Sequence, residues 1–330
     1  MDFHQPNKTI LEIGCSDYPA LFYCDSYKNG YIIEPQQNDI LKTLCATQGI
    51  VILPGVAEDV PFPEVDEVWI FNLLQHVMDP ALIISKSKAA SRIIRFFEPI
   101  NCKPLDIGHL HDFDLDYFNS SFSGCAKHYP SNPNAEKFHA HECAYGVWEK
   151  HDGTAEGAYL LNCSRQSDIN EHLPVLRKYA ERCKHITEMG FRWGCSIYAF
   201  MVARPERLIS YDIKNDLNVA DVEAIAAKEG VSFQFINKDV LDVVIEETDL
   251  LFIDTFHSAN QLSRELALHS CRVRKYLIFH DTAGFWEDGM DAKGNGIRYA
   301  IEPFMAAHHE WKQVYRAENN GGLLILEKNA

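Results

Sequence analysis

The chain has 330 residues, enough for two domains, and its 24 % charged and 46 % apolar residues are typical of soluble globular proteins. Its formal net charge of −16 argues against nucleic acid or anionic membranes as partners, because both would repel such a surface. Its ten cysteines include no C-x-x-C pair, which argues against zinc-ribbon and thioredoxin-like sites. We find no signal peptide and no apolar run near the ~20 residues of a membrane helix, so we expect a cytoplasmic protein with reduced thiols.

In chain order, four strand-like apolar segments of the first half each have a counterpart in the second half. The pairs are residues 10–14 and 186–190, 31–34 and 208–212, 66–72 and 248–254, and 91–98 and 274–281. In this alignment Asn72 matches Asp254 and Glu98 matches Asp281. Acidic, amide or histidine residues close these strands, and open α/β sheets bind ligands at the carboxyl ends of their strands. The repeat predicts an α/β protein with two Rossmann-like, doubly wound sheets in tandem.

The same pattern divides the chain into three parts. We expect a first unit over residues 1–150, a linker over 151–170 and a second unit over 171–330. The second unit closes with two strand-like runs separated by Asn319-Asn320-Gly321-Gly322, and Asn-Gly between such runs indicates a β-hairpin. We therefore predict that each sheet is mostly parallel and ends in an antiparallel hairpin.

Each unit begins with a strand that leads through an acid and a glycine into a helix. These residues are Glu12 and Gly14 in the first unit, and Glu188 and Gly190 in the second. Glycine permits a tight turn and lets a ligand approach the backbone amides at the start of the helix. Neither loop has the G-x-G-x-x-G pattern expected for a dinucleotide pyrophosphate. An adenosine ligand with an amino-acid tail and no phosphate would suit both loops, and a plain strand-to-helix turn is the alternative.

Acids at the ends of the following strands favour the adenosine ligand. Asp212 lies 24 residues after Glu188, and Glu34 lies 22 residues after Glu12. An acid at this position can accept hydrogen bonds from both hydroxyls of a ribose. Asp239, at the end of the third strand of the second unit, could meet the adenine amino group, and a solvated strand end is the alternative.

These motifs resemble class I S-adenosylmethionine-dependent methyltransferases, once in each half. The second half is similar to the catechol, sugar and macrolide O-methyltransferases in three motifs. They are Glu188-x-Gly190-x-x-x-Gly194-x-Ser196, Phe252-Ile253-Asp254-Thr255-Phe256-His257-Ser258 and Leu277-Ile278-Phe279-His280-Asp281-Thr282. The first half, with residues 73–80 after its fourth strand, resembles the broad small-molecule methyltransferase group, but Ser16 stands in place of the second loop glycine.

The resemblance implies S-adenosyl-L-methionine as cofactor. The residues that it implies for binding are Glu188, Gly190, Gly194, Ser196, Asp212, Asp239 and Asp254 in the second unit, and Glu12, Gly14 and Glu34 in the first. We expect the second unit to be the catalytic one. The first unit is then either a second active methyltransferase or a degenerate one that serves structure and substrate capture.

Asp254 and Asp281 end adjacent strands, which would bring their carboxylates together above the sheet. In the metal-dependent relatives, acids at these strand ends hold a divalent cation, and two carboxylates with an imidazole would suit Mg²⁺ or Mn²⁺. His257 and His280 are candidates for a third ligand or a general base, so His280, Asp281 and His257 form the predicted catalytic set. Two alternatives stay open: a histidine base without metal, or a purely structural role in which Asp281 caps a turn.

The resulting functional prediction is methylation of a hydroxyl on a small molecule or glycan. A non-catalytic protein that binds S-adenosylmethionine or S-adenosylhomocysteine is one alternative, and a nicotinamide-dependent oxidoreductase is another, which the glycine pattern disfavours. The sequence sets no oligomeric state, and a homodimer is one option.

Overall fold

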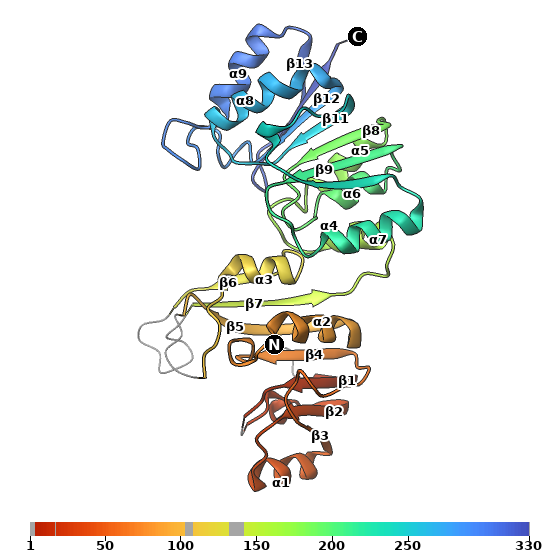
Figure 1. Ribbon diagram of the computed structural model, residues 1–330, viewed down its shortest axis with the longest axis vertical. Helices are drawn as coiled ribbons and strands as arrows, with labels where there is room; N and C mark the ends of the chain where they lie inside the picture. Colours follow the sequence, from red (N-terminus) through yellow and green to blue (C-terminus); the bar gives the residue numbers. More distant parts are fainter. Residues whose placement is uncertain (1–3, 17, 103–107, 132–141, 330) are drawn as a thin grey trace. The chain divides into compact units, whose positions relative to one another are not determined.

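The computed structural model describes residues 4–16, 18–102, 108–131 and 142–329. The chain divides into two compact units, residues 1–150 and 151–330. The sequence-ordered colours of Figure 1 let the reader follow each unit in turn. Within the described ranges, no helix is long and apolar enough to cross a membrane.

The first unit is a seven-stranded mixed sheet with the order β3-β2-β1-β4-β5-β7-β6. Its elements are β1 (His4–Ile13), β2 (Ser26–Glu34), α1 (Asp39–Gln48), β3 (Ile50–Pro54), β4 (Glu67–Phe71), α2 (Pro80–Ala90), β5 (Ile93–Ile100), α3 (Leu115–Ser121), β6 (Lys127–Tyr129) and β7 (Glu142–Glu149). Strands β1 to β5 run parallel, whereas β7 is antiparallel to both β5 and β6.

The second unit is a seven-stranded sheet with the order β10-β9-β8-β11-β12-β14-β13. Its elements are α4 (Ala155–Ser164), α5 (Leu173–Ala180), β8 (His185–Met189), α6 (Ile197–Met201), β9 (Arg207–Asp212), α7 (Val219–Glu229), β10 (Phe233–Asn237), β11 (Thr248–Ile253), α8 (Ala259–His269), β12 (Val273–His280), α9 (Arg298–Ala307), β13 (Trp311–Ala317) and β14 (Leu323–Lys328). The last two strands form the predicted hairpin, with Asn320, Gly321 and Gly322 at positive φ in its turn. The predicted fold of two Rossmann-like α/β sheets is confirmed.

The loops after β1 and β8 have the same backbone arrangement. The amide of Gly14 donates to the carbonyl of Ile33, and the amide of Gly190 donates to the carbonyl of Tyr211, both over 2.9 Å. Both glycines have positive φ, +68° and +96°. The predicted match between residues 12–14 and 188–190 therefore holds in three dimensions.

The sheet register corrects one detail of the predicted repeat. The paired positions are Ile13 with Ile70 and Ile70 with Phe96 in the first sheet, and Met189 with Ile253 and Ile253 with Phe279 in the second. Ile70 is thus equivalent to Ile253, so Phe71, and not Asn72, is the residue equivalent to Asp254. The match of Asn72 with Asp254 was wrong by one residue. Glu98 and Asp281 remain equivalent.

Residues 151–170, which we expected to be a linker, lie within the second unit. Helix α4 begins after Thr154, whose hydroxyl accepts a hydrogen bond from the Gly157 amide over 3.0 Å. Ala155, Ala158 and Tyr159 lie on one helical face and are buried in the core of this unit. This stretch therefore packs as a helix and does not merely connect two domains.

Helices cover both faces of the second sheet, and each face has its own apolar core. One core joins α4, α5, α6 and α7 to the sheet, for example Leu176 and Phe200 packed with Phe252. The other joins α8 and α9 to the sheet, for example Leu266 and Phe304 packed with Phe279. Strands covered on both faces lack a polar–apolar alternation, and β11 is buried along its whole length.

The first sheet contains a buried charge cluster around Glu67, whose side chain is fully buried. Its carboxylate accepts hydrogen bonds from Arg95 Nε over 2.7 Å, from Trp69 Nε1 over 2.9 Å and from the Lys8 ammonium group. Burial by itself would raise the pKa of Glu67, but the hydrogen bonds from Arg95, Lys8 and Trp69 lower it to about 2. The carboxylate is therefore charged and fully paired.

Candidate functional site

The carboxyl ends of β11 and β12 bring Asp254, His280 and Asp281 together. His280 Nδ1 lies 3.3 Å from Asp254 Oδ1 and 3.6 Å from Asp281 Oδ1. One potential ligand atom from each of the three residues lies within 4.8 Å of the others, a geometry that could hold a metal ion. It is the one such group found among the described residues. Two acids far apart in the sequence meet here because parallel strands end at one edge of the sheet.

The backbone holds Asp281 in place for this role. Asp281 has a left-handed φ of +56°, which is rare for a residue other than glycine. Its carbonyl, rather than its carboxylate, accepts the hydrogen bond from the turn amide of Phe285, over 3.0 Å. A Cβ on Gly321 would lie 2.2 Å from Asp281 Oδ1, so only glycine fits beside this carboxylate.

Charges within the cluster shift the pKa values of its members. Burial would raise the pKa of Asp254, but the imidazoles of His280 and His257 lower it far below its usual range. Burial lowers the pKa of His280, but Asp254 and Asp281 outweigh that effect and raise it to about 9. Burial raises the pKa of Asp281, and the nearby Asp254 carboxylate adds to the rise. At neutral pH the Asp254 carboxylate is therefore paired with a protonated His280, and a cation at this cluster would have to displace that proton.

His257 completes the cluster from the turn between β11 and α8. Its Nε2 lies 3.1 Å from Asp254 Oδ1 and 3.5 Å from Asp281 Oδ2. Its ring stacks on Phe285, with ring centroids 4.9 Å apart and planes at 5°. All three members of the predicted catalytic set, His280, Asp281 and His257, therefore surround one point above the sheet.

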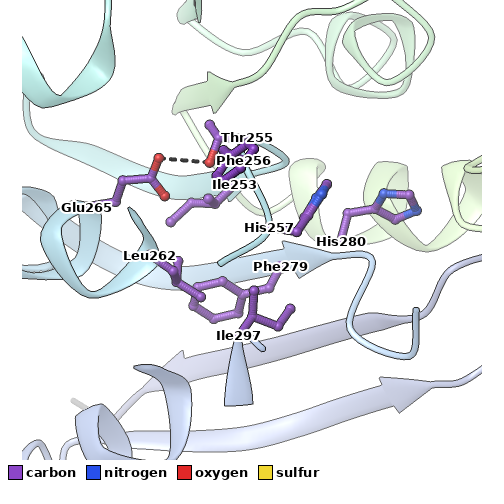
Figure 2. A pocket seen from close by; sticks show the side chains of 9 residues that line it. All are labelled: Ile253, Thr255, Phe256, His257, Leu262, Glu265, Phe279, His280 and Ile297. Carbon is purple, nitrogen blue, oxygen red and sulfur yellow. Dashed lines mark hydrogen bonds between the residues drawn. The ribbon is translucent and has the colours of Figure 1, made fainter. Parts of the chain in front are cut away.

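A small cavity lies beside this cluster, and its lining is drawn in Figure 2. Its polar wall includes His257, His280, Thr255 and the fully buried Glu265. Glu265 Oε1 accepts hydrogen bonds from Thr255 Oγ1 over 2.7 Å and from Gln261 Nε2 over 2.8 Å. Burial raises the pKa of Glu265 to about 7 against these bonds. Glu265 thus fixes the turn that carries Asp254 and His257.

Asp212, the acid predicted to bind a ribose, lies beside the loop that follows β8. Asp212, half-buried at the end of β9, accepts hydrogen bonds from the Arg192 amide over 2.9 Å and from the Lys214 amide over 2.8 Å. Arg192 has a left-handed φ of +46°. A Cβ on Gly190 would lie 1.9 Å from the carbonyl oxygen of Asp254, so this backbone approach requires glycine. The loop therefore passes directly beside the end of β11.

Other residues implied for cofactor binding lie around this loop, but their side chains have different partners. The fully buried Glu188 accepts hydrogen bonds from Ser196 Oγ over 2.5 Å and from Ser210 Oγ, and burial raises its pKa to about 8. Gly194, at φ +76°, forms the turn between them. Asp239 is exposed and accepts a hydrogen bond from the Leu241 amide over 2.8 Å. The hydrogen bond between Glu188 and Ser196 thus holds the two ends of the loop together and leaves the Glu188 carboxylate buried.

The first unit repeats the loop, but Glu34 is more deeply buried than its counterpart Asp212. Glu34 accepts hydrogen bonds from the Ser16 amide over 2.9 Å and from the Gln36 amide over 3.0 Å, and only 6 % of it is exposed. Ser16, at φ +52°, has the left-handed conformation of Arg192. Glu12 accepts hydrogen bonds from the Ala20 and Leu21 amides over 2.7 Å and 2.9 Å. Burial raises the pKa of Glu12 to about 7.

In the described part of the first unit, the strand ends carry apolar residues at two positions of the cation cluster. By the sheet register, Phe71 and Phe97 occupy the positions of Asp254 and His280. Glu98, at the position of Asp281, is fully buried and accepts hydrogen bonds from the amides of Leu73 and Leu74 over 2.8 Å and 3.1 Å. Both oxygens of the Glu98 carboxylate therefore already accept hydrogen bonds from backbone amides.

Sequence reasoning missed two residues of the site. Glu265 lies on α8, eight residues after His257, and its spacing there resembles that of an ordinary helix residue. Asp168, within the stretch expected to be a linker, contacts His280 through its carbonyl, which lies 3.2 Å from His280 Nε2. No local pattern marks Asp168, because its contact spans 112 positions of the chain.

No protein-family model and no curated protein matches this chain. Three solved structures are similar to part of it: the YcgJ protein from Bacillus subtilis, the N-terminal domain of EvdMO1 with SAH bound, and the N-methyltransferase NodS from Bradyrhizobium japonicum WM9. Their sequence identities are 13 %, 14 % and 12 %, with TM-scores of 0.33, 0.34 and 0.35. The alignments cover 38 %, 43 % and 49 % of this chain and 64 %, 74 % and 97 % of those chains. Similarity of this size carries no argument about activity, which has to come from the residues of the site.

Proposed function

We propose that the second unit is an S-adenosylmethionine-dependent methyltransferase that methylates a hydroxyl of a small molecule or glycan. The observation that carries the proposal is the convergence of Asp254, His280 and Asp281 directly beside the Gly190 loop. A nucleoside held at Asp212 would extend along that loop toward the cluster. A methyl donor and an acceptor hydroxyl would then meet above the ends of β11 and β12.

The cluster fits a divalent cation such as Mg²⁺ or Mn²⁺. Two carboxylates and one imidazole are ligands of the type that these ions accept, with the remaining positions open to water or acceptor. His280 Nε2 faces the Asp168 carbonyl, which can only accept, so a cation that displaces the Nδ1 proton would leave the remaining proton on Nε2 and meet the Nδ1 lone pair. A cation bound at these residues would supply positive charge that stabilises a deprotonated acceptor oxygen.

His257 is the proposed general base. Its Nε2 faces the gap between Asp254 and Asp281, where an acceptor hydroxyl would lie. The stacking on Phe285 fixes the plane of the ring. The carboxylates beside Nε2 can only accept hydrogen bonds, so the base role requires an acceptor hydroxyl to replace this contact and a neutral ring whose proton is on Nδ1. His257 could act as the base in a mechanism with a divalent cation and in one without. A chelator would inhibit only the mechanism that uses the cation.

We further propose that the first unit does no methyl transfer. Apolar Phe71 and Phe97 stand where the second unit has Asp254 and His280, and the Glu98 carboxylate accepts hydrogen bonds from two backbone amides. Glu34 and Asp212 accept equivalent hydrogen bonds from backbone amides, but Glu34 is buried whereas Asp212 is half-buried, so Glu34 is less accessible to a ribose. These observations support the degenerate alternative, in which the first unit serves structure or substrate capture.

Calorimetric titration of the full chain with S-adenosylhomocysteine tests the cofactor assignment. We expect a stoichiometry near one, a loss of about tenfold in affinity for Asp212→Asn and no change for Glu34→Gln, because a charge-assisted hydrogen bond is worth about 1.5–3 kcal/mol. A stoichiometry near two would contradict the proposal for the first unit. Absence of binding would overturn the methyltransferase assignment.

Transfer of labelled methyl from S-adenosylmethionine to a panel of phenols, sugars and glycosides tests the reaction. We expect products that depend on Mg²⁺ or Mn²⁺ and disappear with EDTA. Products that persist in EDTA would favour the histidine base without metal. Tight S-adenosylhomocysteine binding with no transfer to any acceptor would favour a non-catalytic binding protein.

A further inference from the structure

Asp168 contacts both halves of the candidate site. It lies in the loop of residues 165–172 between α4 and α5. Its carbonyl oxygen is 3.2 Å from His280 Nε2, and its carboxylate forms an ion pair with the guanidinium group of Arg192. One residue thus joins the imidazole of the cation cluster to the loop of the nucleoside site.

At the cation end, Asp168 fixes an imidazole that is almost inaccessible to solvent. His280 is 2 % exposed, and Asp254 is the partner of its other ring nitrogen, over 3.3 Å. The second ring nitrogen of a metal-binding histidine commonly donates a hydrogen bond from its N–H group to a carboxylate or carbonyl. This bond sets the tautomer and the ring orientation. The Asp168 carbonyl is in that position.

At the proposed nucleoside site, Asp168 contacts Arg192, whose backbone amide donates to Asp212, the acid proposed to bind the ribose. The Arg192 amide donates to Asp212 Oδ2 over 2.9 Å, while its guanidinium group stacks 3.8 Å from the centre of the Trp193 ring. The Asp168 and Arg192 side chains are 41 % and 52 % exposed, so their ion pair contributes little stability by itself. It can nevertheless transmit the order of one loop to the other.

The backbone of the Asp168 loop is also held from a third side. With its amide oriented to match its neighbours, Asn320 donates to the carbonyls of Ser167 and Asp168 over 2.8 Å and 3.2 Å. His172 Nε2 lies 2.9 Å from the Asn319 carbonyl in the same β13–β14 turn. The Asp168 loop is therefore held at its backbone by the hairpin and at its carboxylate by Arg192, so the loss of either contact would leave it less ordered.

We propose that Asp168 is a positioning residue through which nucleoside binding strengthens cation binding. This inference rests on the proposed function of the second unit. A nucleoside bound at Asp212 orders the Arg192 loop and, through the ion pair, the Asp168 loop, so less order remains to be lost when His280 binds a cation. Because the ion pair is half-exposed, we expect a modest coupling of about threefold.

The test measures the Mn²⁺ affinity of the full chain by electron paramagnetic resonance, with and without saturating S-adenosylhomocysteine. Asp168→Asn keeps the backbone carbonyl and the side-chain shape but removes the charge that pairs with Arg192. Glu206→Gln is the matched control, because it breaks the exposed ion pair with Lys184 before β8 and β9. Asp254→Asn identifies the signal of the cation cluster.

We expect S-adenosylhomocysteine to tighten Mn²⁺ binding about threefold in the wild type and in Glu206→Gln, and less than about 1.5-fold in Asp168→Asn. Each ligand alone should bind Asp168→Asn within about twofold of the wild type, and Mn²⁺ should tighten S-adenosylhomocysteine binding by the same factor as the reverse. Arg192→Gln should reproduce the loss, with no further loss in the double variant.

Two results would overturn the inference while leaving the proposed function intact. One is normal binding of both ligands without coupling in the wild type, and the other is undiminished coupling in Asp168→Asn. If the wild type binds neither S-adenosylhomocysteine nor Mn²⁺, the proposed function fails and the inference fails with it.

Discussion

The two units share a strand order and a loop backbone, but they use the carboxyl ends of their strands differently. In the second unit these ends carry Asp254, His280 and Asp281, whose polar atoms face one another. In the first unit the equivalent of Asp281 is Glu98, which binds two backbone amides. The comparison shows that one position of a repeated fold can bind backbone amides in one copy and face a cluster of polar side chains in the other.

The largest effect should come from removing a carboxylate of the cation cluster. We expect Asp254→Asn to lower Mn²⁺ affinity and methyl transfer by about 10²–10³-fold, because a charged ligand in a low-dielectric site is lost. Asn72→Ala is the control, since the uncorrected alignment makes Asn72 the counterpart of Asp254 and the sheet register does not. Equal losses in the two variants would contradict the assignment.

The second-largest effect should be a difference in destabilisation between alanine at Gly190 and alanine at Gly14. A Cβ on Gly190 would meet the Asp254 backbone at 1.9 Å, whereas one on Gly14 would meet the movable Leu73 side chain at 2.3 Å. Both positions have positive φ, so strain adds about 1 kcal/mol to each. We expect Gly190→Ala to cost about 3–4 kcal/mol of unfolding free energy and Gly14→Ala about 1–2 kcal/mol, measured by urea denaturation.

Glu98 and Asp281 offer the most direct comparison of stability with function. Glu98→Ala leaves two buried amides without an acceptor, so we expect it to cost about 2–4 kcal/mol of unfolding free energy. Asp281→Asn keeps a residue that tolerates the left-handed φ, so it should change the free energy of unfolding by less than about 1 kcal/mol but abolish Mn²⁺ binding. Comparable destabilisation by both variants would mean that Asp281 is structural, as the turn-capping alternative holds.

The smallest change in stability is expected when three residues of the first sheet are replaced by their equivalents in the second sheet. Leu250, Phe252 and Ile278 occupy the positions of Glu67, Trp69 and Arg95. Replacing a complete buried ion pair by apolar residues is often neutral, whereas breaking it costs about 3–5 kcal/mol. We therefore expect the triple variant Glu67→Leu, Trp69→Phe, Arg95→Ile to stay within about 1 kcal/mol of the wild type.

Arg95→Ile alone is the control for the triple variant, because it leaves Glu67 with Lys8 and Trp69 as its remaining partners. It should be much less stable than the triple variant in the same urea titration. A triple variant as unstable as the single one would show that the first sheet does not tolerate the apolar packing of the second.

The sequence predicted the sheets and the meeting of Asp254 with Asp281, because parallel strands bring their carboxyl ends to one edge whatever the loops do. The sequence could not predict which residue of β4 is equivalent to which residue of β11. Residues 67–71 are mainly buried, so no alternation marks which side chain faces which side. An alignment error of one residue, which exchanges the two faces, therefore left no trace in the apolar pattern.

Contacts across long stretches of chain were also beyond prediction. Asp168 reaches His280, and Glu265 reaches Thr255, through packing of loops and helices that the repeat does not encode. The polar tract 164–171 has the composition of a linker, and composition does not distinguish an exposed connection from a loop held by Asn320.

The position of α4 decides how the second unit should be isolated for crystallisation or exchange experiments. A fragment that begins at residue 171 would lack Ala155, Ala158 and Tyr159 and would leave apolar side chains of α5 and α6 open to water. It would also lack Asp168 and its contact with His280. A fragment that begins at residue 151 keeps both, and it corresponds to the compact unit of residues 151–330 with its own core and every residue of the candidate site.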